Sequence, residues 1–121
     1  MPLENHSPYI LWFNQVDKED IPLVGGKGAN LGEMTKIGAA VPDGFIVSAA
    51  AYFYFLKENN LEEKIRTLLR QVNPSKPESY QEVAGKIQRL IINSPMPKDL
   101  ALQIMKAYLK LGKGIQEPLV A

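Results

Sequence analysis

The sequence predicts an α/β (or α+β) fold of a few short strands with about five helices. Three observations predict it. A β-branched and aromatic run at residues 9–13 is typical of a strand. Four stretches after residue 48 repeat apolar residues every three or four positions, as amphipathic helices do. The length of 121 residues allows one domain with a core of useful size.

The first part of the chain combines the predicted first strand with a glycine-rich segment. Residues 14–22 are polar and end in a proline, so we expect a connection there. A helix is predicted from Ala29, where apolar residues begin to recur with a spacing of three, and Gly38 is its expected C-terminal cap. A turn at residues 41–44 then leads into a short buried strand at residues 45–47.

Helices are predicted for most of the remainder. Ser48 can cap a helix over residues 49–58. Asn60 and Glu63 have the spacing of a capping box at the next helix start, and Pro97 suits the first position of the last helix. The side chains expected to face inward are Tyr52, Phe55, Leu56, Leu61, Ile65, Leu68, Leu69, Val72, Tyr80, Val83, Ala84, Ile87, Leu90, Ile91, Leu100, Ile104, Ala107, Tyr108 and Leu111.

The last four residues, 118–121, have the composition of a strand that has just begun. Natural domain termini are usually polar and frayed, so we expect this chain to be truncated within a longer protein.

Composition excludes several function classes. A formal net charge of +1 predicts no strong attraction to nucleic acid or to an anionic membrane. The sequence has no cysteine, which excludes disulfides, thiolate zinc sites and cysteine nucleophiles. No apolar run approaches the roughly 20 residues that span a bilayer, and no signal peptide is recognisable. The expected protein is cytoplasmic.

The segment that suggests chemistry is the cluster Gly25, Gly26, Lys27 and Gly28. Glycines let a backbone approach a ligand closely, amides at a helix start favour an anion, and a lysine adds a mobile positive charge. This combination favours polyphosphate binding. Its spacing matches neither a Walker A loop nor a dinucleotide fingerprint. The same residues would also suit a flexible turn without a ligand, in which the glycines cap a helix and the lysine is solvated.

Two motifs identify a family resemblance. Residues 23–34 read LVGGKGANLGEM, and residues 41–45 follow with VPDGF. This order closely resembles the start of the pyruvate-phosphorylating dikinases, and more the phosphoenolpyruvate synthases (pyruvate, water dikinases) than pyruvate, phosphate dikinase. The resemblance covers roughly residues 9–121. It implies the first part of an ATP-grasp-type nucleotide-binding domain at the front of a long multidomain enzyme, with residues 1–121 as a single fragment of that domain.

The resemblance also implies an activity and a site. The family converts ATP, pyruvate and water to AMP, phosphate and phosphoenolpyruvate through a phosphohistidine, and it requires Mg²⁺. Lys27 matches the family lysine that would contact ATP phosphates, with the amides of Gly25, Gly26 and Gly28 beside it. The expected partners are ATP, pyruvate and the remaining domains of the same enzyme. Asn30 and Glu33 could orient the loop, although helix-start polarity explains them equally well.

The family's catalytic residues have no counterparts in this sequence. The family's arginine motif, acidic magnesium ligands and phosphorylated histidine are missing, so we expect no catalytic residue, no metal ligand and no activity from the fragment alone. His6 precedes the first strand, outside the family motif. Adjacent carboxylates in a loop are more often solvated than bound to a metal, and we interpret Asp17, Glu19 and Asp20 in this way.

Three alternatives to the synthase stay open. A rifampicin phosphotransferase is similar over the same span, and so is a pyruvate, phosphate dikinase. The third alternative is a non-catalytic helical binding module.

Overall fold

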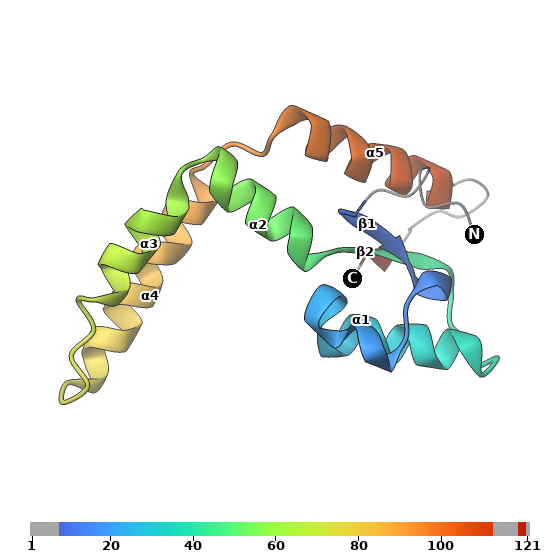
Figure 1. Cartoon of the computed structure of the whole chain (residues 1–121), viewed down its shortest axis with the longest axis horizontal. Coiled ribbons are helices and arrows are strands. Elements are labelled where there is room, and N and C mark those ends of the chain that lie inside the picture. Colours follow the sequence, from blue (N-terminus) through green and yellow to red (C-terminus); the bar gives the residue numbers. More distant parts are fainter. Residues whose placement is uncertain (1–7, 113–118, 121) are drawn as a thin grey trace. The chain divides into compact units, whose positions relative to one another are not determined.

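The computed structural model describes residues 8–112 and 119–120, and these residues fall into two compact units. The first unit combines Met1–Phe53 with Lys98–Ala121, and the second is Tyr54–Pro97. The described residues form five α-helices and one small sheet (Figure 1). A mixed helix and strand fold is therefore confirmed.

The sheet of the first unit has three strands in the order β1-β2-β3. They are β1 (Ile10–Trp12), β2 (Gly44–Val47) and β3 (Leu119–Val120). β2 pairs antiparallel with β1 and parallel with β3. The predicted strands at residues 9–13 and 45–47 are confirmed to within one residue at each end. The predicted strand at 118–121 is confirmed at its two central residues, and the outer two lie outside the described residues.

Two helices pack on opposite faces of this sheet, as Figure 1 shows for α1 (Ile21–Lys36) and α5 (Lys98–Gly112). Successive residues of a strand point to opposite faces. Phe45 accordingly joins a cluster with Ala107 and Leu111 of α5, whereas Ile46 joins a second cluster with residues of α1 and the segment before it. Trp12 lies opposite Phe45 in the register, with ring centroids 5.4 Å apart.

The helix predicted from Ala29 begins eight residues earlier, at Ile21. Residues 14–22 are thus not a plain connection. They hold two 3-10 turns, η1 (Phe13–Gln15) and η2 (Lys18–Asp20), and the start of α1, with Pro22 in its first turn. Proline is well tolerated there because the first amides of a helix have no partner within it. Pro22, which was interpreted as the end of a connection, lies instead in the first turn of a helix.

The C-terminal cap predicted at Gly38 is confirmed. Gly38 has a φ of 81°, and its amide donates to the Thr35 carbonyl at 3.2 Å. The Ala39 amide donates to the Met34 carbonyl at 3.0 Å. This pair of bonds is a Schellman motif, which requires a left-handed residue at the position that glycine occupies.

The cap predicted for the next helix is also confirmed. α2 (Ala49–Glu58) follows Ser48, whose Oγ accepts from the Ala51 amide at 3.4 Å. The same hydroxyl donates to the Pro8 carbonyl at 2.6 Å, which ties the segment before β1 to the start of α2. Ser48 is buried with both of its hydrogen-bonding roles used. Of the predicted inward residues of α2, Leu56 is buried, but Tyr52 is exposed.

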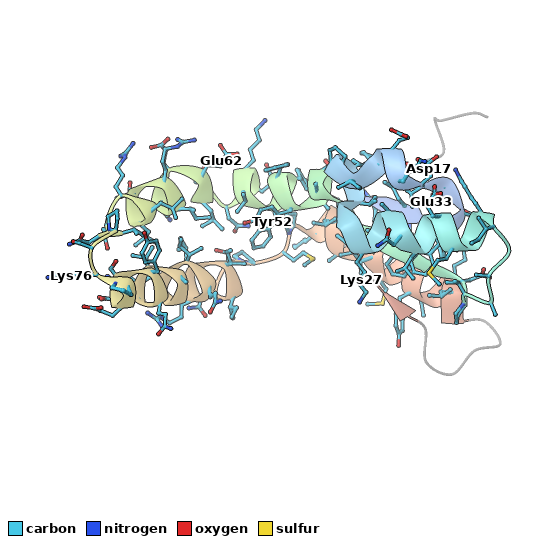
Figure 2. The ribbon with its side chains drawn as sticks, turned by 90° about the horizontal axis from the view of Figure 1, so that it is seen from below. Asp17, Lys27, Glu33, Tyr52, Glu62 and Lys76 are labelled. Carbon is cyan, nitrogen blue, oxygen red and sulfur yellow. The ribbon has the colours of Figure 1, made fainter. Side chains whose placement is uncertain are left out.

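The second unit contains α3 (Leu61–Leu69) and α4 (Pro77–Ile92), which lie side by side in Figures 1 and 2. The predicted capping box at Asn60 is wrong. Asn60 adopts a left-handed conformation with a φ of 54°, and its side chain makes no capping hydrogen bond. Left-handed backbone turns the side chain away from the following amides, and asparagine tolerates it better than most residues.

The apolar stripes of the later helices are confirmed in part. Leu61, Val83, Leu100, Ala107 and Leu111 are buried as predicted. The predicted inward residues that are exposed are Leu69, Tyr80, Ala84 and Tyr108. Helical spacing defines an apolar face but not how wide a strip of it the neighbouring element covers. Pro97 directly precedes the first residue of α5.

An ion pair joins the 3-10 turns to the end of α1. Lys36 Nζ lies 2.9 Å from Asp17 Oδ2, and Asp17 Oδ1 also accepts from the Glu19 amide. Two hydrogen bonds lower the pKa of Asp17 below 3.8. The larger effect comes from the Lys36 side chain and the smaller one from the Glu19 amide. The bond to Asp17 raises the pKa of Lys36 above 10.5.

We predict a matching pH dependence of local stability. The contribution of Asp17 is present above its unfolded-state pKa, near 3.8, and is lost as pH falls through the lower folded value. The contribution of Lys36 is present below 10.5 and is lost as pH rises through its higher folded value. Amide hydrogen exchange of residues 17–36 should therefore show less protection at pH 3 than at pH 6, after correction for intrinsic rates.

The matched variant is Asp17→Asn, which keeps a capping oxygen but cannot ionise. Its protection should change less between the two pH values than that of the parent, while Glu78→Gln in α4 should leave the parent's pH dependence unchanged. The effect should be small because exposed ion pairs contribute little. Equal pH dependence in the parent and in Asp17→Asn would contradict the prediction.

Candidate functional site

The glycine-rich cluster lies inside α1 rather than in an open loop. Gly25 interrupts the helix with a φ of 77° and a ψ of 169°, so one helical turn precedes it and a longer helical segment follows. The first amides of a helical segment lack acceptors within that segment. The break therefore creates a helix start at residues 26–28, as was expected of the predicted loop. The positive φ at the break itself favours glycine.

Gly26 and Lys27 follow the break on the solvent side. Both residues are exposed, and a Cβ built on Gly26 would meet no atom within 4 Å. Among the residues that the structure describes, Lys27 has no ion-pair partner. The combination of an uncovered backbone, a helix start and an unpaired ammonium group can receive an anion.

Gly28 and Gly32 face the opposite way, into the protein. Both are buried, and they stand one helical turn apart on the same face of α1. A Cβ on Gly28 would lie 3.0 Å from Ile46 Cδ1, and a Cβ on Gly32 would lie 2.2 Å from the Val16 carbonyl oxygen. The missing side chains let α1 approach the sheet and the segment before it. This approach fixes where the exposed Gly26 and Lys27 stand.

Gly32 is the structural residue that the sequence reasoning missed. Its signal was present in the printed sequence, because Gly28 and Gly32 are four residues apart and small residues at this spacing share one helix face. The motif was interpreted only for its possible contact with a ligand. Gly28 and Gly32 of this motif serve packing instead.

The two residues expected to orient the loop differ in their contacts. Glu33 Oε2 accepts from the Lys18 amide at 3.0 Å, so it joins α1 to the turn η2. Figure 2 shows Glu33 near Asp17, with Lys27 farther along the helix. Asn30 is exposed. Glu33 thus holds the segment that precedes α1, and neither side chain has a hydrogen bond to the glycine cluster among the described contacts.

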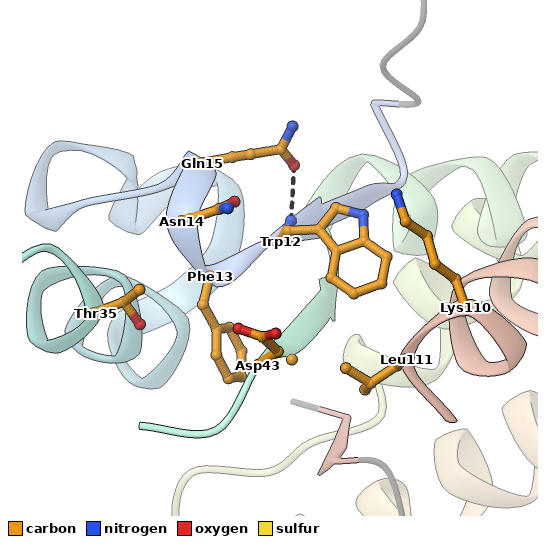
Figure 3. A pocket seen from close by; sticks show the side chains of 9 residues that line it. Trp12, Phe13, Asn14, Gln15, Thr35, Asp43, Lys110 and Leu111 are labelled. Carbon is orange, nitrogen blue, oxygen red and sulfur yellow. Dashed lines mark hydrogen bonds between the residues drawn. The ribbon is translucent and has the colours of Figure 1, made fainter. Parts of the chain in front are cut away.

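A pocket of about 440 Å³ lies elsewhere in the first unit (Figure 3). It is lined by Trp12, Phe13, Asn14, Gln15, Thr35, Asp43, Gly44, Lys110 and Leu111. Lys110 Nζ lies 5.3 Å from the centroid of the Trp12 ring, a cation–π distance. Lys27 and the glycines of the cluster at residues 25–28 do not line this cavity. The exposed face at Gly26 is an open surface in the part of the chain that is described.

The acidic residues before α1 are engaged in local structure. Asp17 accepts from the Glu19 amide and from Lys36, and Asp20 Oδ2 accepts from the Asp17 amide at 2.9 Å. Within residues 8–112 and 119–120, no three histidine, cysteine or acidic side chains gather as metal ligands would. His6 lies outside the described residues. None of the described helices is long and apolar enough to cross a membrane.

Comparison with known proteins identifies the fold family. Residues 21–121 match the family model described as the pyruvate phosphate dikinase AMP/ATP-binding domain. The matched part begins at the first residue of α1 and includes the glycine cluster. A family resemblance carried by residues 23–45 is thereby confirmed.

Curated relatives match across most of the chain. A probable phosphoenolpyruvate synthase of Staphylothermus marinus is 42% identical over 88% of this chain and 13% of its own length. The phosphoenolpyruvate synthases of Aeropyrum pernix and Aquifex aeolicus are 42% and 38% identical, each over 93% of this chain and 14% of their own length. The chain therefore spans about a seventh of the length of these relatives.

Proposed function

Since this chain belongs to the pyruvate phosphate dikinase AMP/ATP-binding domain family, we propose that it forms the ATP-phosphate-binding part of a phosphoenolpyruvate synthase. The complete enzyme would convert ATP, pyruvate and water to AMP, phosphoenolpyruvate and phosphate through a phosphohistidine. This chain would contribute the first part of an ATP-grasp-type domain, with the remaining domains of the same cytoplasmic enzyme as its partners. The histidine and the pyruvate site would lie in those domains.

The observation that carries the proposal is the restart of α1 after Gly25. The positive φ at Gly25 ends one helical turn and presents the amides of Gly26, Lys27 and Gly28 at a new helix start. In the proposed site these amides and the Lys27 ammonium hold ATP phosphates. Asn30 and Glu33 would act on the glycine cluster only through the helix that they share with it, since the Glu33 side chain accepts from the Lys18 amide of η2.

Each glycine has a separate role in this proposal. Gly25 supplies the backbone conformation, Gly26 leaves the approach to the amides uncovered, and Gly28 brings the helix against β2. Lys27 supplies a charge without a competing partner among the described residues. Charge-assisted hydrogen bonds to such a group contribute about 1.5 to 3 kcal/mol each.

Mg²⁺ would accompany ATP in the complete enzyme, because metal ions neutralise the charge that develops in phosphoryl transfer. The described residues offer no cluster of three acidic ligands, so they do not fit a resident metal site. We therefore assign no metal ligand in this chain and propose that the ion is held by residues of the remaining domains.

The relatives favour the synthase over the alternatives. They carry the name phosphoenolpyruvate synthase and match over most of this chain, whereas a rifampicin phosphotransferase or a helical module without a nucleotide site has no observation in its favour. Pyruvate, phosphate dikinase shares the family domain. Sequence outside this chain would distinguish an enzyme that uses phosphate as the second phosphoryl acceptor from one that uses water.

The test uses Gly26→Ala in the complete enzyme. The added methyl group has open space within this chain, so folding should be unaffected or slightly improved by the higher helix propensity of alanine. The same methyl group would stand where a phosphate approaches, so Mg-ATP binding measured by calorimetry should weaken by about fivefold, roughly 1 kcal/mol.

Gly85→Ala in α4 is the matched control for this substitution. Its Cβ would meet only the flexible Arg89 side chain, at 3.4 Å, so it should fold normally and bind ATP like the parent. Parental ATP affinity in Gly26→Ala would contradict the proposed phosphate site.

A further inference from the structure

The pocket of about 440 Å³ in the first unit has a buried apolar base and a charged rim (Figure 3). Phe13 and Leu111 form the base, with exposed fractions of 4% and 5%. A Cβ on Gly44 would lie 2.4 Å from Phe13 Cε2, so the glycine at this position lets the ring pack against β2. Asp43 and Lys110 are exposed at the rim. A concave site with an apolar base and a few polar groups is the usual form of a small-molecule site.

Asp43 and Lys110 line the same pocket without pairing with each other. Asp43 directly precedes β2, and Lys110 lies in the last turn of α5. None of the ion pairs found among the described residues includes either group. The Lys110 ammonium lies over the Trp12 ring, a contact that leaves its charge in place. The rim therefore carries one negative and one positive group, and both can still bind an opposite charge.

This pair of charges limits the class of ligand. A simple anion would be attracted by Lys110 but repelled by Asp43, and a simple cation would meet the reverse. A molecule that carries both charges can place each of them opposite its complement. Asn14 on the same rim can donate and accept hydrogen bonds, and Phe13 and Leu111 at the base favour an apolar group. The pocket therefore fits a small zwitterion with an apolar part better than it fits a polyphosphate.

The pocket lies away from the proposed phosphate site. Gly44 lines the pocket from the first residue of β2, whereas the glycine cluster meets the same strand at Ile46. Thr35 lines the pocket from the last turn of α1. It follows Gly26 by nine residues, which corresponds to roughly 13 Å along a helix axis. The two sites therefore use opposite ends of α1, and a ligand in one need not exclude a ligand in the other.

We propose that this pocket binds a small zwitterion of the α-amino-acid type that carries an apolar side chain. The carboxylate of the ligand contacts the Lys110 ammonium, and its ammonium group contacts the Asp43 carboxylate. Its side chain lies against Phe13 and Leu111. This is a second binding site of the chain, separate from the one proposed for ATP phosphates. Because exposed charges at a rim are well solvated, we expect weak binding, with a Kd on the order of 1 mM.

The experiment follows Trp12 in the complete enzyme, because its ring lines the pocket and lies against the Lys110 ammonium. The enzyme is labelled with fluorotryptophan, and the fluorine NMR signal of Trp12 is assigned by its absence in Trp12→Phe. Titration with L-leucine should shift this signal to saturation, because the bound carboxylate draws the ammonium away from the ring. The proposal is overturned if L-leucine, L-valine and L-phenylalanine all leave the signal unshifted at about twentyfold the expected Kd.

Two further probes test whether both charges of the ligand are needed. The carboxylate 4-methylpentanoate is leucine without its ammonium group, and the amine 3-methylbutylamine is leucine without its carboxylate. Each should bind about tenfold more weakly than L-leucine or worse, since it leaves one rim charge without a partner. An affinity of either probe equal to that of L-leucine would indicate apolar binding alone and would refute the assignment of a zwitterion.

Lys110→Met and Asp43→Asn remove the two rim charges with little change in side-chain size. Each should raise the Kd for L-leucine by about tenfold or more, because a charge-assisted hydrogen bond is lost. Lys106→Met is the matched control, since Lys106 is exposed one turn earlier in α5 and does not line the pocket. If Lys110→Met disturbs folding, as judged by circular dichroism, Lys110→Gln gives the same test. Parental affinity in both charge-removing variants would contradict the proposal.

This outcome is separable from the fate of the phosphate site. The titration requires no nucleotide, and at saturating Mg-ATP L-leucine should give the same shift of the Trp12 signal. Competition between the two ligands would place the pocket within the nucleotide site and would overturn the proposal of a second site. Weakened ATP binding in Gly26→Ala without any response to L-leucine would remove this proposal alone, and the reverse pair of results would remove the phosphate site alone.

Discussion

Gly32→Ala is expected to loosen the packing of α1 against the segment that precedes it, by about 2 to 3 kcal/mol. An alanine Cβ would lie 2.2 Å from the Val16 carbonyl oxygen and 2.7 Å from its carbonyl carbon. Backbone atoms cannot rotate away as a side chain can, so the helix itself must shift. Val16 is buried at 1% exposure within the cluster that also holds Phe13 and Ile46, so the shift disturbs the core.

The measurement is hydrogen exchange of residues 10–47 in the complete enzyme. Protection of slowly exchanging amides in α1 and β2 should fall by roughly 30- to 150-fold, since each 1.4 kcal/mol is a factor of ten. Gly26→Ala is a matched control in the same helix, because the same chemical change there meets no atom within 4 Å. Equal protection in the two variants would show that the close approach at Val16 is not maintained in solution.

The failure to predict this helix start has a physical cause. Glycine disfavours helices by about 1 kcal/mol relative to alanine, so a run with four glycines between residues 25 and 32 favours a loop by local propensity. Tertiary packing overrides that preference, because Gly28 and Gly32 allow close contacts with Ile46 and Val16 that a larger residue would prevent. Local rules predicted the end of the helix at Gly38 because a Schellman motif depends on neighbouring residues alone.

The same distinction applies to the other elements. Ser48 and the strand Ile10–Trp12 were predictable from local chemistry, and both are confirmed. The capping box at Asn60 failed because its backbone is left-handed, which side-chain spacing does not reveal. The exposure of Tyr52 and Tyr108 depends on which neighbouring element covers a helix face, and an amphipathic pattern contains no such information.

The candidate site divides along similar lines. The motif predicted which residues to consider, and their chemistry predicted an anion as the ligand. The structure adds that Gly26 and Lys27 face solvent whereas Gly28 faces the core. The spacing of Gly28 and Gly32 places them on one face of the helix, but it does not say which face meets the core. That depends on contacts with Ile46 and Val16, which are distant in the sequence.

Lys27→Ala in the complete enzyme is expected to lower kcat/KM for ATP by roughly ten- to a hundredfold. The proposed ammonium–phosphate bond is charge-assisted, and such bonds contribute about 1.5 to 3 kcal/mol. A loss in that range corresponds to this factor. Lys27 is exposed and has no ion-pair partner among the described residues, so removing its side chain should leave folding intact.

Two comparison variants separate a phosphate contact from a general charge effect. Lys57→Ala removes an exposed lysine from α2 and should leave the kinetics for ATP unchanged. Lys27→Arg keeps the charge but replaces a compact ammonium group with a planar guanidinium, so we expect partial recovery. Because counter-ions screen charges at long range, a general effect would shrink with added salt and would be shared by Lys57→Ala. A local phosphate contact predicts instead a loss specific to position 27, and parental kinetics in Lys27→Ala would refute the assignment of this lysine to the ATP phosphates.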